Sequence, residues 1–278
     1  MKIEALPSPN FNDRKHPIDM LVFHYTGMET GQEALDRMCD AAAEVSAHYM
    51  IWEDGRVVQL VGEDKRAWHA GVSSWQGDTD LNSRSIGIEI VNGGHDWPLP
   101  GNVLPPFPTA QIEALIELSR GILDRWDIPG SRIVGHSDIA PARKADPGEH
   151  FPWDQLARAG IGLWPLTLSE NSAVPPDVVI TGRFLQEPQV IGRGLGPSDG
   201  KGDDKGAVGR MQAMLASMGY ELPETGTYDA ATEAVIRAFQ RRWVQDRVTG
   251  HADITTLQRI GIINLMYQTA VETEADDS

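Results

Sequence analysis

The sequence predicts an α/β protein in which helices flank a mixed central β-sheet, followed by a small three-helix domain at the C-terminus. Over residues 1–165, short apolar runs typical of buried strands alternate with segments of helical composition. Two of the runs flank a Glu-Asp-Gly turn, which favours an antiparallel hairpin. From residue 203 onward, apolar residues recur at helical spacing in three segments.

Composition and charge limit the number of domains and the kinds of partner that we expect for this chain. The chain has 278 residues, which is enough for one large and one small domain. Its net charge is −16 and it has no Lys/Arg-rich run, so we expect neither nucleic acid nor an anionic membrane surface as a general partner. No stretch of about 18 apolar residues is present, so we expect no membrane span.

The N-terminus and the single cysteine bear on the compartment. The first residues lack the apolar core of a secretory signal, so we expect a cytoplasmic location, with the periplasm or cell envelope as the alternative. Cys39 excludes an intrachain disulfide. Because Cys39 lies in a segment of helical composition, we interpret it as a small buried residue rather than a catalytic thiol.

The elements of the first domain follow in order. Residues 1–17 are polar and Pro-rich, which indicates an irregular arm, and residues 65–71 and 78–84 read as loops. Thr109 is expected to cap a helix that runs to about Asp127, with apolar residues at helical spacing. The remaining expected elements are strands at 20–23, 46–52, 56–61, 85–91 and 133–134, and a helix at 31–44.

Two histidines stand at the ends of buried strands. His24 follows the run 20–23, and His136 follows the run 133–134 after a glycine. A Pro-containing loop then places Lys144 and Asp146 close behind His136. Imidazole and carboxylate ligands with a nearby cation are typical of a zinc hydrolase site. Taken alone, each segment also fits an ordinary hydrogen-bonded histidine and common turn chemistry.

Other polar residues can be interpreted in two ways. Glu89 lies between isoleucines in an apolar strand, and a carboxylate there is either a general base with a raised pKa or half of a structural ion pair. His48 lies within an expected strand, where a packed or hydrogen-bonded core histidine is favoured. Trp68 and His69 precede an Ala-Gly pair, a pattern that fits either the wall of a ligand cleft or a hydrophobic anchor.

The C-terminal part changes character. Residues 166–202 lack a periodic pattern and read as an interdomain linker. Residues 203–266 predict three helices with Met and aromatic residues on their core faces, and residues 267–278 read as a solvated acidic tail. The expected division is therefore a domain at 1–165, the linker, a three-helix domain at 203–266, and the tail.

Six motifs fall in order along residues 18–165, and together they are highly specific. They are Phe23-His-Tyr-Thr, Ser46-Ala-His-Tyr-Met-Ile-x-x-Asp-Gly, Ala67-Trp-His-Ala-Gly, Asn82-x-x-Ser-Ile-Gly-Ile-Glu, Gly135-His-Ser-Asp-Ile-Ala-Pro and Lys144-x-Asp-Pro-Gly. This region resembles the AmpD/AmiD group of zinc N-acetylmuramoyl-L-alanine amidases. The C-terminal unit, with Thr225-Gly-Thr-Tyr-Asp and Ala238-Phe-Gln, is similar to the three-helix peptidoglycan-binding domain often joined to such enzymes.

The resemblance implies a chemistry and a partner. It implies one zinc ion and hydrolysis of the amide bond between the lactyl group of N-acetylmuramic acid and L-alanine, in peptidoglycan or anhydro-muropeptides. The residue roles that it implies are zinc ligands at His24, His136 and Asp146, a general base at Glu89, a cation for the transition state at Lys144, and substrate contacts at Arg66, His69 and Asn82.

Two departures separate this chain from related phage amidases and recognition proteins. Those proteins have a Cys as the third zinc ligand and a catalytic Tyr, where this chain has Asp146 and Ala47. A peptidoglycan-binding or sensing protein with a structural metal is the second hypothesis, and the complete ligand set argues against it. Whether anhydro-muropeptides or intact sacculi are the preferred substrate stays open in the sequence.

Overall fold

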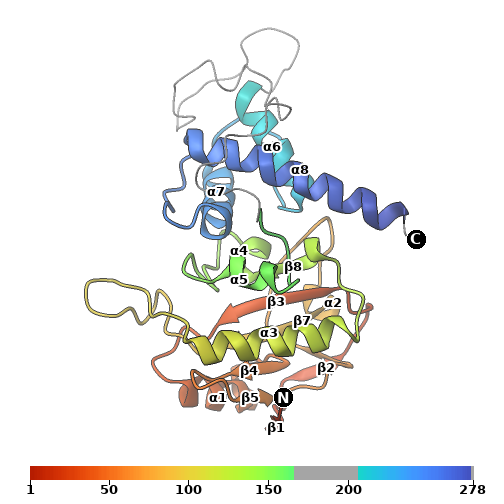
Figure 1. The fold of residues 1–278 in the computed structure, drawn as a ribbon, viewed down its shortest axis with the longest axis vertical. Coiled ribbons are helices and arrows are strands. Elements are labelled where there is room, and N and C mark those ends of the chain that lie inside the picture. Colours follow the sequence, from red (N-terminus) through yellow and green to blue (C-terminus); the bar gives the residue numbers. More distant parts are fainter. Residues whose placement is uncertain (166–205, 277–278) are drawn as a thin grey trace.

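A six-stranded mixed sheet forms the centre of the first part of the chain (Figure 1). The structure is a computed structural model that describes residues 1–165 and 206–276, with side chains described as far as Thr269 in the last helix. The strand order is β1-β5-β4-β7-β3-β8, and a separate antiparallel pair joins β2 to β6. The strands are β1 (Ile3–Ala5), β2 (Phe11–Asp13), β3 (Met20–Tyr25), β4 (Tyr49–Ile51), β5 (Val57–Gln59), β6 (Lys65–Ala67), β7 (Ser85–Ile90) and β8 (Ile133–Gly135).

Strand direction follows from the connections. β4 and β5 form the expected hairpin and pair antiparallel, with Gly55 in the left-handed region at the turn. β4, β7, β3 and β8 are parallel to one another. The carboxyl ends of β7, β3 and β8 therefore meet at the same edge of the sheet, which is where ligand sites of parallel sheets form.

Both faces of the central strands are buried, as expected for parallel strands. In β3, Leu21 and Phe23 pack with the apolar face of α3 (Thr109–Leu123), while Met20 and Val22 join a core that includes the C-terminal helices. Figure 1 shows α3 lying across the sheet and the C-terminal helices beyond β8. At the other end of the sheet, α1 (Gly31–Cys39) begins with a capping box between Thr30 and Glu33.

Short helices connect the strands near the sheet edge. They are η1 (Ala41–Ala43), α2 (Leu81–Arg84), η2 (Gly130–Arg132), α4 (His136–Ile139) and α5 (Trp153–Arg158). The C-terminal part has the three expected helices, α6 (Gly206–Met218), α7 (Ala230–Trp243) and α8 (Ile254–Asp276). Of the helices that the structure describes, none is long and apolar enough to cross a membrane.

The C-terminal helices pack directly on the first domain through a buried ion pair. Arg242 of α7 donates from Nη1 to Asp138 Oδ2 of α4 at 3.0 Å and from Nη2 to the carbonyl of Ile133 at 3.0 Å. Tyr220 donates its hydroxyl to the other oxygen of Asp138 at 2.8 Å. The Arg242 guanidinium also lies 4.1 Å from the ring centre of Trp153. Because separating a buried ion pair leaves an uncompensated charge on each side, these contacts couple the position of α7 to that of α4.

Several expected elements differ from the structure. The N-terminal segment is not an irregular arm, because β1 adds to the sheet beside β5 and β2 pairs with β6, whose residues 65–67 were expected in a loop. The expected loop at 78–84 contains α2. Pro108, not Thr109, is the N-cap of α3, and α8 continues to Asp276, so the segment from 267 is not a separate tail. The expected linker at 166–202 lies outside the described residues.

Candidate active site

The carboxyl ends of β7, β3 and β8 bring three chemistry-bearing residues together. His24 is the fifth residue of β3 and lies in register with Glu89 of β7. Phe23 of β3 is in register with Gly135 of β8, which places His136, the first residue of α4, beside His24. The loop after α4 returns Asp146 to the same point, where its backbone carbonyl accepts from the Ser137 N–H.

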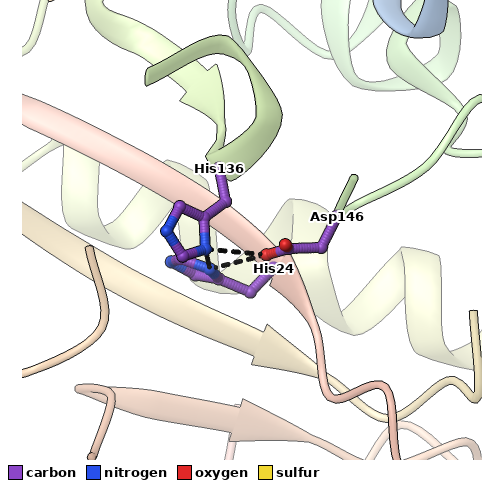
Figure 2. A group of neighbouring side chains, drawn as sticks. All are labelled: His24, His136 and Asp146. Atoms are coloured by element: carbon purple, nitrogen blue, oxygen red, sulfur yellow. Dashed lines mark hydrogen bonds and ion pairs between the residues drawn. The ribbon is translucent and has the colours of Figure 1, made fainter. Parts of the chain in front are cut away.

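His24, His136 and Asp146 form a compact buried triangle (Figure 2). The two Nδ1 atoms are 3.0 Å apart, and Asp146 Oδ2 lies 2.9 Å from Nδ1 of His24 and 3.0 Å from Nδ1 of His136. All three side chains are almost fully shielded from solvent. Two imidazole nitrogens and one carboxylate oxygen that converge in this way are a ligand set that suits zinc.

The remaining ring nitrogen of His136 fixes its tautomer. Nε2 lies 3.1 Å from the carbonyl oxygen of Ala70, which can only accept a hydrogen bond. Nε2 must therefore carry the proton, and in the neutral ring Nδ1 presents a lone pair to the triangle.

A chain of hydrogen bonds fixes His24 in the same way. Ser85 donates its hydroxyl to the Leu81 carbonyl at 2.6 Å, so its oxygen accepts from Nε2 of His69 at 3.3 Å. Nδ1 of His69 is then the acceptor for Nε2–H of His24 at 3.0 Å. Nδ1 of neutral His24 is left as a lone pair that faces Nδ1 of His136 and the carboxylate.

Three acceptors without a proton between them repel one another unless a cation lies among them. Burial and, to a smaller extent, the neighbouring His136 lower the pKa of His24 to about 4, which favours the neutral ring near neutral pH. The residues therefore fit a metal cation, and the outer contacts to His69 and Ala70 are of the kind that orient metal-binding imidazoles.

Gly87 explains why the motif before Glu89 contains glycine. A Cβ atom at Gly87 would overlap the ring of His69, so only glycine leaves room for the ring that supports His24. The glycine in this apolar strand is therefore a packing requirement of the site.

Glu89 is a carboxylate without a protein partner. Its Oε2 is buried and has no hydrogen-bond partner among the described residues. Burial raises the pKa of Glu89 well above its ordinary value, and the negative charge of Asp146 raises it further, against the opposing charge of Lys144. No structural ion pair of Glu89 is present in the described part of the chain.

One cavity of about 360 Å³ connects these groups. Its walls include the three triangle residues, Glu89 and the exposed Lys144. The cavity is thus lined by possible metal ligands, by a carboxylate with a raised pKa and by a cation. These are the groups that the hydrolysis of an amide requires.

The three residues expected to touch substrate lie elsewhere or act differently. Arg66 pairs with Asp80 at 2.6 Å and, like Asn82, does not line the cavity among the described residues. Asn82 is buried, and its side-chain oxygen accepts from the N–H groups of His69 and Ala70, which fixes that loop. His69 lines the cavity but is only 5% exposed, with both ring nitrogens used by His24 and Ser85.

A further histidine in the cavity wall gave no signal in the sequence. His95 lies in the Gly/Pro-rich segment after β7, and its Nδ1 is 2.9 Å from the hydroxyl of Tyr25. Its Nε2 is 3.1 Å from a carboxylate oxygen of Glu149. Only the tertiary structure brings this loop over the end of β3, so strand periodicity could not find it.

Sequence families match both parts of the chain. Residues 14–149 match the family described as N-acetylmuramoyl-L-alanine amidase, and residues 204–260 match a peptidoglycan-binding domain family. The chain is 36% identical over 240 residues to the N-acetylmuramoyl-L-alanine amidase AmiD of Escherichia coli, covering 82% of this chain and 84% of that protein. It is also 36% identical over 170 residues to the 1,6-anhydro-N-acetylmuramyl-L-alanine amidase AmpD of Haemophilus influenzae, covering 54% and 88%.

Solved structures agree with these matches. Escherichia coli AmiD, in complex with the substrate anhydro-N-acetylmuramic acid-L-Ala-D-γ-Glu-L-Lys, has a TM-score of 0.68 at 36% identity and covers 90% of this chain and 89% of that chain. AmpDH3 of Pseudomonas aeruginosa has a TM-score of 0.69 at 32% identity and covers 90% and 92%. The expected fold class is confirmed, and the chain belongs to the family of N-acetylmuramoyl-L-alanine amidases.

Proposed function

We propose that the enzyme uses one zinc ion, held by His24, His136 and Asp146, to hydrolyse the amide between the lactyl group of N-acetylmuramic acid and L-alanine. The observation that carries this proposal is the triangle of three proton-free acceptors in the wall of a cavity that also holds Glu89 and Lys144. Bound there, zinc would polarise the scissile carbonyl and lower the pKa of a water molecule.

The protein's own groups supply the proton transfers. Glu89 takes a proton from the attacking water, because its raised pKa makes the carboxylate a stronger base than an exposed one. The hydroxyl adds to the lactyl carbonyl carbon, the carbon–nitrogen bond breaks, and the proton held by Glu89 passes to the leaving nitrogen of L-alanine. The ammonium of Lys144 on the same cavity stabilises the oxyanion that develops on the carbonyl.

Substrate identity is inferred from the relatives. AmiD was captured with an anhydro-muramyl tripeptide and AmpDH3 with an anhydromuramic pentapeptide, so we propose an anhydro-muropeptide as a substrate of this enzyme. Cleavage of anhydro-muropeptides alone would fit fragment recycling in the cytoplasm, whereas cleavage of intact sacculi would fit a role in the cell envelope.

We further propose the division into a catalytic domain at 1–165, a linker at 166–202 and a peptidoglycan-binding domain at 203–266. The family match at 204–260 supports a wall-binding role for the C-terminal helices. Sedimentation of the full chain with sacculi, compared with a chain that ends at residue 165, tests that role.

The direct test uses both substrates. The zinc-loaded full chain is incubated with anhydro-muropeptides and, separately, with intact sacculi, and the products are identified by mass spectrometry. We expect free peptides that begin at L-alanine, loss of their release with a chelator, and recovery with zinc. Failure of the zinc-loaded protein to release peptide from either substrate would contradict the proposed function.

A further inference from the structure

A second cavity adjoins the active site between the loop 141–145 and helix α7. It encloses about 430 Å³ and shares Arg143, Lys144 and Ala145 with the cavity at the metal site. Its other wall is one face of α7. The residues of α7 that line this wall recur at helical spacing and include Arg237 and Arg241. We call this cavity the basic groove.

Positive charge is concentrated in the basic groove. Four of its lining side chains are cationic, namely Arg143, Lys144, Arg237 and Arg241, and one, Glu233, is anionic. The other lining residues are alanines and a proline, which leave the cationic groups accessible. In a chain with a net charge of −16, such a concentration of cations favours an anionic ligand.

The two arginines of α7 differ in how far they are neutralised. Arg237 pairs with Glu233 at 3.0 Å and its side chain is 39% exposed. Arg241 lies 3.9 Å from the nearest carboxylate oxygen, that of Glu149, and its buried Nε has no hydrogen-bond partner among the described residues. The charge of Arg241 also acts on Asp146 and Tyr25, which places it within electrostatic reach of the metal site.

Helix α7 is fixed in this position. Arg242, next to Arg241, is buried in its ion pair with Asp138 and lies over the ring of Trp153. These contacts tie the helix to α4, whose first residue is His136. The cations of α7 are therefore held in place beside the cavity at the metal site.

We propose that the basic groove binds the free carboxylate of the stem peptide beside the bond that is cut, an inference that rests on the proposed function. In the substrate bound to AmiD the second residue is a γ-linked D-glutamate, and this linkage leaves its α-carboxylate free. That carboxylate follows the L-alanine of the scissile amide by one residue, so it lies within about 7 Å along an extended chain. Arginine guanidinium groups bind carboxylates in a bidentate manner that lysine cannot match.

The test compares two anhydro-muramyl tripeptides that differ only at this position, one with the α-carboxylate and one with an α-carboxamide. For the zinc-loaded full chain we expect kcat/KM to favour the carboxylate substrate by at least about 10-fold, the range of a hydrogen bond to a charged group. In the double variant Arg237→Gln/Arg241→Gln we expect the preference to fall to about 1, through a higher KM for the carboxylate substrate.

Controls separate this outcome from general damage. Zinc content and far-UV circular dichroism equal to those of the unaltered protein report that the double variant is folded. Arg158→Gln removes one positive charge at an exposed position outside the groove and should keep the full preference. Equal kcat/KM for both substrates in the unaltered enzyme, or a preference that survives in the double variant, would overturn the proposal.

A binding measurement keeps this result distinct from failure of the proposed function. Calorimetry with the free peptide L-Ala-D-γ-Glu-L-Lys and its α-carboxamide does not depend on turnover. Tighter binding of the carboxylate form, lost in the double variant, supports the groove even if no amide is cut. Equal binding of both forms to the unaltered chain overturns it.

Discussion

Two buried histidines on either side of β7 differ in their hydrogen-bond partners. His24 lies on β3 and His48 directly precedes β4, and both are essentially inaccessible to solvent. Nδ1 of His48 accepts the Gly87 N–H at 3.0 Å, so the neutral ring carries its proton on Nε2 and donates it to the Lys65 carbonyl at 3.0 Å. Every nitrogen of His48 is satisfied by the protein, whereas Nδ1 of His24 faces two other acceptors.

The comparison shows what distinguishes a buried histidine that could bind a metal from a structural one. Residue type and burial are the same in the two cases. The difference is whether the partners of a ring nitrogen are complementary to it, as at His48, or are acceptors like itself, as at His24. The variants below test this distinction, from the largest expected effect to the smallest.

Removing a ligand should have the largest effect. His24→Ala leaves the triangle with one imidazole fewer, so we expect zinc to be lost and turnover of an anhydro-muropeptide to fall to background. Metal content after dialysis and peptide release measure the two losses. His48→Ala is the matched control and should retain zinc, and loss of zinc from it as well would break the comparison.

Glu89 should affect turnover and leave the metal in place. Glu89→Gln keeps the size of the side chain but cannot take a proton, so we expect kcat to fall about 100- to 10,000-fold. Zinc content should equal that of the unaltered protein. Unchanged turnover would remove Glu89 from the mechanism, and loss of zinc would show that it also supports the ligands.

The supporting histidine should have an intermediate effect on metal affinity. His69→Ala removes the acceptor that fixes the tautomer of His24, so we expect zinc affinity to fall about 10- to 100-fold. Competition with a chromogenic chelator measures this affinity. Affinity equal to that of the unaltered protein would mean that the ring of His69 only fills space over Gly87.

Substitution of His48 should lower the free energy of unfolding and leave zinc binding unchanged. His48→Ala leaves the Gly87 N–H and the Lys65 carbonyl with one partner fewer, so the free energy of unfolding should fall by about 1–3 kcal/mol. Urea denaturation of the zinc-free protein measures the loss. A stability equal to that of the unaltered chain would contradict the structural role.

The free energy of unfolding should also depend on pH through the buried, neutral ring of His48. Burial and, to a smaller extent, the charge of Arg14 lower the pKa of His48 from its ordinary 6.5 to about 3. The unfolded chain therefore binds more protons than the folded chain between these values, and stability falls as the pH drops from about 6.5 toward 3. In His48→Gln this contribution is absent, so urea midpoints should change less steeply with pH, and identical slopes would contradict it.

The sequence predicted the parts of the site that depend on local pattern. The strand at 85–90, the hairpin after 52 and the histidines near strand ends follow from apolar runs and turn residues, and the structure has them. The resemblance then supplied the ligand set, and the structure brings those three residues within contact. Hydrogen-bond partners were not predictable, because those of the His69, Asn82 and Arg66 side chains come from segments 12 to 54 residues away.

Apolar runs, turn residues and motif order by themselves determined the class of fold and the amidase family, because these depend on residue type and spacing along the chain. Only the tertiary structure decided which histidine nitrogens lack a complementary partner, how the N-terminal segment joins the sheet, and that α7 lines a cavity beside the candidate active site. Those outcomes depend on the direction of side chains from distant segments, which no local pattern records.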